Sequence, residues 1–353
     1  MAHFAQSPYF VLHQLTCQFA DGETLFGPLD LAFDRQRCGL VGRNGVGKTQ
    51  LLRLIAGRDR PGNGHVESHA ALAYVAQQPE IAADTTLAQL LGYGEVFAAL
   101  ARIEQGRPLA DDIDRLEGRW DLNDRLQSAF AAAGLPAFDP LRSACDLSGG
   151  ERMRAALCGA FLGEADYLLL DEPTNHLDSA GRAWLYQQLE RWQGGLLIAS
   201  HDRQLLGRME RIVELTPGAL RSYGGNYDEY QRQRMAEQQA ARAALEHAVT
   251  DRRRTRARMH KEHDAAQRRS AQTLRTVDTL NIASFERVKY KGAAKERPGT
   301  LRRQHREQNS SLNAAVQQAR ERVEEETPVM FTLPGSEVAA GKQVLVVESL
   351  QLD

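Results

Sequence analysis

Residues 42–49 read GRNGVGKT, a glycine-rich segment that ends in Lys48 and Thr49. It follows the strand-like run CGLV and precedes the helical run QLLRLIAG. Glycines in such a loop let backbone N–H groups surround a phosphate at the start of a helix. The lysine then reaches the β- and γ-phosphates of a nucleotide, and the hydroxyl binds Mg²⁺. A chance glycine-rich turn is the alternative, but the flanking strand and helix favour a nucleotide-binding loop.

In the segment YLLLDEP at residues 167–173, an apolar run is followed directly by two carboxylates. At the tip of a buried strand, Asp171 is expected to hold Mg²⁺ through water, and Glu172 to orient or deprotonate an attacking water. A helix cap is the alternative interpretation. His201 follows the strand-like GLLIAS, at the sheet edge where ligands gather in α/β folds. A neutral imidazole there is expected to contact the γ-phosphate, although a single histidine is often structural.

The segment LSGGE (Leu147–Glu151) lies between these motifs and opens a helical stretch. Gly149 and Gly150 leave backbone N–H groups accessible at a helix start, which predicts a second anion-binding turn. A plain helix cap explains the pentapeptide alone. Its position about 20 residues before the carboxylate strand favours the anion-binding interpretation.

Strand-like runs in residues 10–75 and 167–223 flank a helical region at 85–140, an alternation that predicts an α/β fold. Hydrophobic residues are 42% of the chain, as in ordinary globular proteins. No apolar run approaches the roughly 18–20 residues that cross a bilayer. The four scattered cysteines suggest reduced thiols in the cytoplasm.

Acidic and basic residues are unevenly distributed along the chain. Residues 1–225 hold 21 Lys+Arg against 28 Asp+Glu, whereas residues 251–306 hold 17 against 6, a net charge of +11. A basic block in an acidic chain indicates a polyanionic partner, with a solvated helical face as the alternative. Residues 231–265 contain almost no Gly or Pro. In residues 301–326, apolar residues recur at 4-3-4 spacing, namely Leu312, Val316, Ala319 and Val323. These patterns predict two antiparallel helices, the first roughly 60 Å long.

The order of motifs resembles that of the ATP-binding cassette (ABC) ATPases across residues 10–223. The resemblance implies a glutamine loop at Gln77, with Gln78 as the alternative, and a D-loop at residues 175–178. It implies three catalytic residues (Glu172, His201 and Gln77) and three Mg²⁺ ligands (Thr49, Gln77 and Asp171). The implied ATP contacts are Phe19, Gly42, Arg43, Asn44, Gly45, Val46, Gly47, Lys48, Thr49, Gln50, Ser148, Gly149, Gly150 and Asp178. Gln50 departs from the family, because most members carry a second Ser or Thr there that touches the α-phosphate.

The expected fold is therefore a P-loop NTPase cassette with a β subdomain, a RecA-like core and a helical subdomain at about 85–160, all within residues 1–230. A charged helical linker, a long antiparallel hairpin, follows at 231–327. Residues 328–353 resemble the first strand of another cassette. We expect the chain to be a fragment or truncation of a two-cassette protein, because the family binds two ATP molecules between paired cassettes, in cis or as a homodimer.

The stretch YGGNYDEY (223–230) and the wording DEPTNHLD (171–178) are similar to the ABC-F subfamily. That resemblance implies a cytoplasmic ATPase on the ribosome, whose linker points at the P-site tRNA and the peptidyl-transferase centre. Translation control and antibiotic protection both occur in the subfamily. The basic linker, residues 251–306, is then the contact with rRNA and tRNA. Phe285 and Tyr290 would stack on bases or pack between the helices. The ATPase subunit of a membrane transporter is the alternative, and a DNA-repair ATPase is a third.

Overall fold

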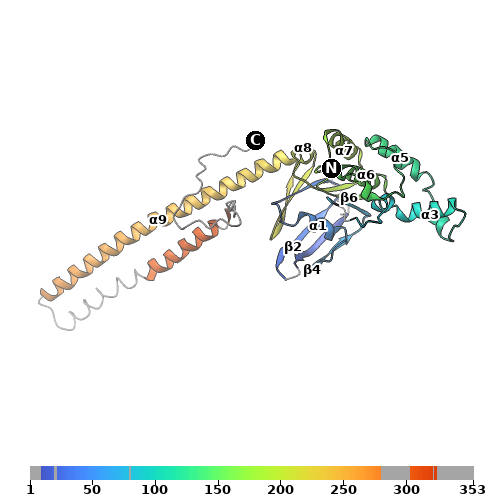
Figure 1. The fold of residues 1–353 in the computed structure, drawn as a ribbon. Helices are drawn as coiled ribbons and strands as arrows, with labels where there is room; N and C mark the ends of the chain where they lie inside the picture. Colours follow the sequence, from blue (N-terminus) through green and yellow to red (C-terminus); the bar gives the residue numbers. More distant parts are fainter. Residues whose placement is uncertain (1–8, 20–21, 79–80, 280–302, 321, 324–353) are drawn as a thin grey trace, which may run out of the picture. The chain divides into compact units, whose positions relative to one another are not determined.

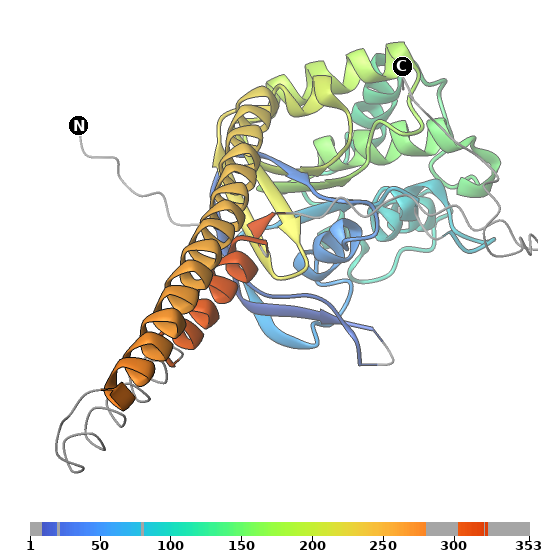
Figure 2. The ribbon, with the colours of Figure 1, turned by 90° about the vertical axis from the view of Figure 1, so that its left-hand side faces the viewer.

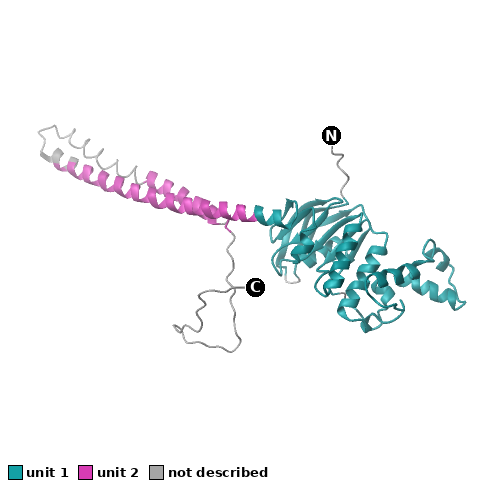
Figure 3. Cartoon of the chain, turned by 90° about the horizontal axis from the view of Figure 1, so that it is seen from above, with its two compact units in different colours: residues 1–233 teal, residues 234–353 magenta. Residues whose placement is uncertain are grey.

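The computed structural model describes residues 9–19, 22–78, 81–279, 303–320 and 322–323. The backbone divides into two compact units, residues 1–233 and 234–353 (Figure 3). The first unit ends close to residue 230, where the sequence predicts the end of the cassette. The predicted opening of a second cassette, residues 328–353, lies outside the described residues.

The larger sheet of the first unit has six strands in the order β5-β6-β7-β3-β8-β9. The first five run parallel, and β9 pairs antiparallel with β8. The central strands are apolar and fully buried, as expected when both faces of a parallel sheet are covered. The strands are β3 (Arg37–Val41), β5 (Leu72–Val75), β6 (Tyr167–Asp171), β7 (Gly195–Ala199), β8 (Arg211–Thr216) and β9 (Ala219–Gly224).

Alternate residues of this sheet feed two cores, because successive side chains of a strand point to opposite faces. On β6, Tyr167 and Leu169 pack with a smaller antiparallel sheet of order β2-β1-β4 and with α1. Leu168 and Leu170 pack with the other helices of the unit. Figure 1 shows α1 beside the small sheet. These elements are β1 (Phe10–Gln18), β2 (Thr24–Phe33), β4 (Asn63–Ser68) and α1 (Lys48–Ile55).

Helices connect the strands of the large sheet, and most of them lie between β5 and β6 in the sequence. The sequence predicts a helical region at 85–140, and within it Gly92 has a left-handed φ of 82° and separates α2 from α3. The elements are α2 (Leu87–Leu90), α3 (Gly94–Glu104), α4 (Asp112–Arg115), α5 (Leu122–Ala132), the 3₁₀ turn η1 (Ala144–Asp146), α6 (Gly149–Leu162), α7 (Ser179–Arg191) and α8 (Arg203–Leu206).

A polar cap begins the long helix α9 (Tyr227–Thr279). The Asn226 side chain accepts the N–H of Glu229 at 3.2 Å, and the Glu229 carboxylate accepts the N–H of Asn226 at 3.2 Å. One turn later, the Tyr230 hydroxyl donates to the buried carboxylate of Glu214 at 3.0 Å. Reciprocal capping and this buried hydrogen bond explain why the helix starts at Tyr227.

In the second unit, α9 lies antiparallel to a helix over residues 303–320 (Figure 2). The Arg256 Nε donates to the side chain of Asn309 at 2.8 Å, and His305 lies 3.3 Å from Glu262. As the residue number rises on α9, the partner number falls, which defines the antiparallel pair. The predicted two-helix hairpin is confirmed for the described residues. Phe285 and Tyr290 lie outside them.

The narrow apolar seam predicted for the second helix is also confirmed. Leu312, Val316, Ala319 and Val323 are half-buried, while most of their neighbours are exposed. On α9, Met259 is almost fully buried in the same unit. In the arginine run at 252–258, Arg252 is half-buried and the other four are exposed, with Arg256 bonded to Asn309 of the opposite helix.

The four cysteines are free, with Cys145 exposed and the others buried. Within the described ranges, no helix is long and apolar enough to cross a membrane. The same residues contain no group of three or more His, Cys, Asp or Glu side chains arranged to hold a metal ion.

Candidate functional site

The loop between β3 and α1 presents backbone N–H groups without side-chain competition. Gly45 and Gly47 have φ of 80° and 102°, in the left-handed region that favours glycine. A Cβ on Gly47 would lie 2.8 Å from the ring of Phe26, so only glycine fits there. Gly47 caps α1 without a side-chain hydrogen bond, and the first turn of α1 holds no acidic residue. The start of α1 is therefore suited to an anion.

Lys48 is the first residue of α1, directly after this loop, and is only 9% exposed. Its ammonium donates to the carbonyl of Gly42 at 3.0 Å and lies 3.1 Å from His201 Nε2. Burial lowers the pKa of Lys48, while the charges of Glu172 and Asp171 act against that shift. The pKa of His201 is lowered by burial and by Lys48, so its imidazole is neutral at pH 7. A neutral imidazole can accept a hydrogen bond from the lysine ammonium or donate one to a phosphate.

Asp171 ends β6 and is 1% exposed. Burial raises the pKa of its carboxyl group, and hydrogen bonds with Thr49 and Tyr74 and the charge of Lys48 oppose that rise. Its Oδ1 is buried with no hydrogen-bond partner. An unpaired buried carboxylate oxygen is costly, and carboxylate, hydroxyl and amide oxygens are ligands that Mg²⁺ accepts. Asp171, Thr49 and Gln77 therefore fit a magnesium ion.

Glu172 occupies an unusual backbone conformation, with φ of 45°. Such a residue stores about 1–3 kcal/mol of strain, and here the Glu172 N–H donates to the carbonyl of Ala199 at 2.8 Å. One carboxylate oxygen accepts the N–H of His201 at 3.4 Å, and the other lies 3.5 Å from His201 Nε2. Burial raises the pKa of Glu172. The strain and the raised pKa both suit a functional carboxylate.

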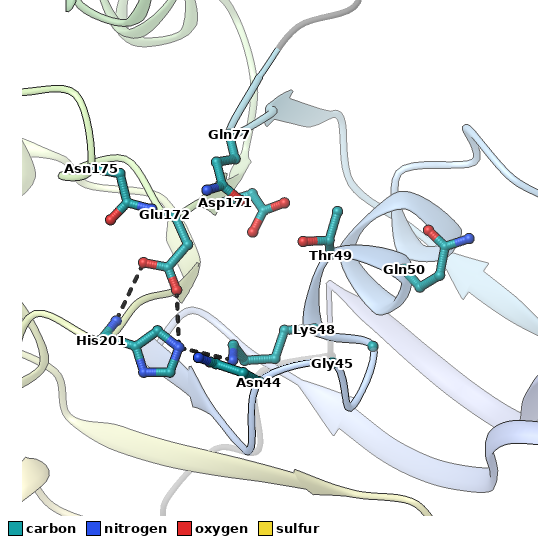
Figure 4. A pocket seen from close by; sticks show the side chains of 11 residues that line it. Asn44, Gly45, Lys48, Thr49, Gln50, Gln77, Asp171, Glu172, Asn175 and His201 are labelled. Atoms are coloured by element: carbon teal, nitrogen blue, oxygen red, sulfur yellow. Dashed lines mark hydrogen bonds and ion pairs between the residues drawn. The ribbon is translucent and has the colours of Figure 1, made fainter. Parts of the chain in front are cut away.

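These side chains share one cavity of about 430 Å³, shown in Figure 4. It brings together most of the residues that the sequence predicts for phosphate, metal and water. Gln77 lines this cavity, whereas Gln78 lines only the neighbouring hollows, which favours Gln77. Gln50 also borders the cavity, away from Glu172 and His201. The lining residues are Asn44, Gly45, Gly47, Lys48, Thr49, Gln50, Gln77, Asp171, Glu172, Asn175 and His201.

Other predicted ATP contacts do not line this cavity. Phe19 follows β1 with 51% of its surface exposed, and Val46 is buried in the core. Asp178 caps α7, accepting the N–H of Gly181 at 2.8 Å. The remaining members of this set are Gly42, Arg43, Ser148, Gly149 and Gly150. Their roles stay predictions.

The LSGGE segment forms a reciprocal helix cap at the start of α6. The Ser148 side chain accepts the N–H of Glu151 at 3.3 Å, and the Glu151 carboxylate accepts the N–H of Ser148 at 2.8 Å. A Cβ on Gly150 would lie 2.7 Å from the carbonyl oxygen of His176, so the backbone passes close there. The helix cap that the sequence also allowed is present. The anion-binding role needs a ligand that approaches from outside this chain.

Sequence reasoning missed Tyr74, and it placed Asn175 in the D-loop without naming it as a residue of this cavity. The Tyr74 hydroxyl lies 3.5 Å from Asp171 Oδ2 because β5 pairs with β6, a pairing that the sequence does not reveal. Asn175 lines the cavity because the chain turns directly after β6, where the Asn175 N–H donates to the carbonyl of Glu172 at 3.2 Å. The helix-breaking Pro173 was the available signal for that turn.

The match to a known protein family covers the same motifs. The protein-family model described as "ABC transporter" matches residues 30–175, which hold the glycine-rich loop, LSGGE and the two carboxylates of β6. Residues 30–175 are therefore similar to the ATP-binding cassette of the ABC ATPase class.

The chain is also similar to several individual proteins. The chain is 36% identical over 240 residues to the energy-dependent translational throttle protein EttA of Mycobacterium tuberculosis, covering 61% of this chain and 42% of that protein. For EttA of Escherichia coli K12, identity is 35% over 242 residues, covering 62% and 43%. For the uncharacterized ABC transporter ATP-binding protein YfmR of Bacillus subtilis, identity is 31% over 240 residues, covering 62% and 38%. The chain is similar to these proteins over about three fifths of its own length and spans less than half of theirs.

Solved structures with a similar backbone also contain cassettes. One is a dimeric post-hydrolysis state of an ATP-binding cassette with ADP and phosphate, with 22% identity, TM-score 0.48, and coverage of 61% of this chain and 98% of that chain. Another is the ATP-binding subunit of an ABC transporter, with 21% identity, TM-score 0.48, and coverage of 64% and 92%.

Glu172 is expected to destabilise the ligand-free protein at neutral pH. Its folded pKa is raised above the ordinary 4.5, so the folded state disfavours the charged carboxylate that dominates at pH 7. The variant Glu172→Gln should melt at a higher temperature than the parent at pH 7, and the difference should shrink as pH falls through the raised folded pKa and be small below about 4.5. Differential scanning calorimetry from pH 7 to pH 4 measures this.

The matched control is Glu164→Gln, because the Glu164 side chain is 85% exposed. That exchange should leave the melting temperature nearly unchanged. A lower melting temperature for Glu172→Gln at pH 7 would contradict the burial argument and show that attraction to Lys48 outweighs it.

Proposed function

We propose that this chain binds ATP with Mg²⁺ in the cavity between α1 and the end of β6, and hydrolyses it. The observation that carries the proposal is the meeting of Lys48 and the start of α1 with Asp171 and Glu172 in one cavity. Cationic and N–H donors on one side suit phosphates, and carboxylates on the other suit a metal ion and water.

Each residue has a separate task in this proposal. Lys48 holds the β- and γ-phosphates, and Thr49, Gln77 and Asp171 hold Mg²⁺, which neutralises phosphate charge when bound. Glu172 orients the attacking water and draws its proton, helped by a raised pKa. The neutral His201 donates its one N–H to the γ-phosphate, and its Nε2 lies 3.1 Å from Lys48 and 3.5 Å from Glu172 before ATP binds.

A second cassette completes the site in this account. Ser148, Gly149 and Gly150 do not line the Lys48 cavity, so they are free to contact ATP held by a facing cassette. Asp178 and Phe19 take their family roles, at the cassette interface and on the adenine. The facing cassette is supplied in cis or by a second copy.

We further propose that ATP turnover acts on translation. Two features support this: identity of 35–36% to proteins named for translational throttling, and a basic helical hairpin directly after the cassette. Residues 251–306 carry a net charge of +11, which suits the phosphate backbone of RNA. The protein then works in the cytoplasm on the ribosome, with the hairpin reaching rRNA and tRNA near the P site. Translation control and antibiotic protection are its two candidate outcomes.

A transporter motor is the second candidate, favoured by the description of the matching family model. Such a subunit would bind a membrane-embedded partner. It offers no use for a basic hairpin after the cassette, so the two functions differ in where the protein is recovered.

Hydrolysis is expected to depend on Glu172. The variant Glu172→Gln keeps the side-chain shape but removes the base, so ATP binding should persist while turnover falls about 10²–10⁴-fold. Phosphate release and equilibrium binding of fluorescent ATP measure both quantities, with Glu164→Gln as the matched control. Unchanged turnover in Glu172→Gln would remove Glu172 from this role.

Ribosome binding is expected to need the hairpin arginines. We would join a second cassette after residue 353, introduce Glu172→Gln and its counterpart, and pellet ribosomes through sucrose with and without ATP. ATP should increase co-sedimentation. Replacing Arg253 and Arg254, both exposed, with Gln should lower the salt slope by roughly 0.7–0.9 for each RNA phosphate that the variant no longer neutralises.

The matched control for that experiment removes two exposed cassette arginines, Arg58 and Arg60, as Arg→Gln variants. These should keep the parental slope. Recovery in the membrane fraction, with no ATP-dependent pelleting on ribosomes, would support the transporter function instead.

A further inference from the structure

A second cavity, of about 340 Å³, lies within the hairpin unit and is separate from the ATP site. Its lining residues are Arg256, Met259, His260, His263, His305 and Asn309. The first four share one face of α9, because residues three and four apart in a helix are neighbours. His305 and Asn309 come from the opposing helix by the same rule. The volume falls in the usual range of small-ligand pockets, about 300–1,000 Å³.

The residues that line this cavity include one methionine and three histidines. Met259 is only 6% exposed, and its thioether is a soft surface on which a flat ring can pack. Three imidazoles surround it. Histidine rings are among the side chains on which unstacked RNA bases stack.

One wall also carries a positioned cation. The Arg256 guanidinium donates from Nε to Asn309 at 2.8 Å and from Nη2 to Asn313 at 3.2 Å. A guanidinium has five N–H donors, so these two bonds orient the group and leave donors for an anion. Arginine held in this way is well suited to a phosphate.

The acidic group nearest the cavity is already paired. The Glu262 carboxylate lies 3.3 Å from His305 and 3.6 Å from Arg258. The surrounding segment, residues 251–306, has a net charge of +11. The cavity therefore combines a cationic setting, a stacking surface and hydrogen-bonding amides.

We propose that this hairpin cavity binds a single unstacked nucleotide of RNA, with its base over Met259 and its phosphate on Arg256. The inference rests on the proposed action on RNA and deepens it, because a basic helix alone would read only the backbone. Imidazole and amide groups add a preference for a nucleotide that has left the helical stack.

The test compares two RNA duplexes of equal length, one with a single bulged 2-aminopurine and one fully paired. Affinity of the full chain is measured by fluorescence anisotropy, and 2-aminopurine emission reports stacking of the bulged base. The bulged RNA should bind about tenfold more tightly, with quenched emission. Arg256→Gln and His305→Ala should each abolish that preference.

Two further variants separate position from charge. Asn309→Ala combined with Asn313→Ala keeps Arg256 but releases it, and should also abolish the preference, with helix content checked by circular dichroism. Arg253→Gln removes an exposed charge outside the cavity and should weaken both RNAs equally.

The outcomes separate this inference from the proposed function. Equal binding of the two RNAs by the parent chain overturns the nucleotide cavity but leaves action on RNA intact. A bulge preference that survives Arg256→Gln and His305→Ala also overturns the cavity. If neither RNA binds and the protein fails to pellet with ribosomes, both proposals fall.

Discussion

Asp171 and Glu172 are buried at the end of one apolar strand, and burial raises the pKa of both carboxyl groups. The folded chain tolerates them because Lys48 and the polar backbone of the loop lie close by. The parallel sheet imposes this meeting, since β3 and β6 are separated by β7 alone and end at the same edge. The same constraint delivers His201 from β7. A ligand that carries both phosphate and Mg²⁺ would satisfy the cation and the carboxylates together.

The sequence predicted the core of this arrangement because short motifs encode it locally. GRNGVGKT specifies its own loop through glycines, and YLLLDE specifies a buried strand with a polar end. Tyr74 and the division at Gly92 escaped prediction because strand register and left-handed turns depend on tertiary packing. The roles of Ser148 and Asp178 depend on a facing cassette, which one chain cannot display.

The hairpin shows how composition underdetermines function. Its net charge indicated a polyanionic partner, but net charge does not distinguish among the five arginines of residues 252–258. The structure separates them: Arg252 is half-buried, and among the exposed arginines Arg256 is hydrogen-bonded to two asparagines. Backbone attraction and nucleotide recognition can therefore reside on different residues of one helix. In the proposed function, the exposed arginines would attract the RNA backbone and Arg256 would fix the position of one nucleotide.

Isothermal titration of ATP tests the central claim most directly, with Mg²⁺ or with EDTA, on the parent chain, Lys48→Ala and Thr49→Ala. The parent should bind ATP more tightly with Mg²⁺. Lys48→Ala should weaken binding at least about tenfold in both conditions, because the variant cannot make a charge-assisted hydrogen bond to phosphate. Thr49→Ala should weaken binding only when Mg²⁺ is present. Parental affinity in Lys48→Ala, or an equal loss with and without Mg²⁺ in Thr49→Ala, would contradict the assignment of this cavity to Mg²⁺ and ATP.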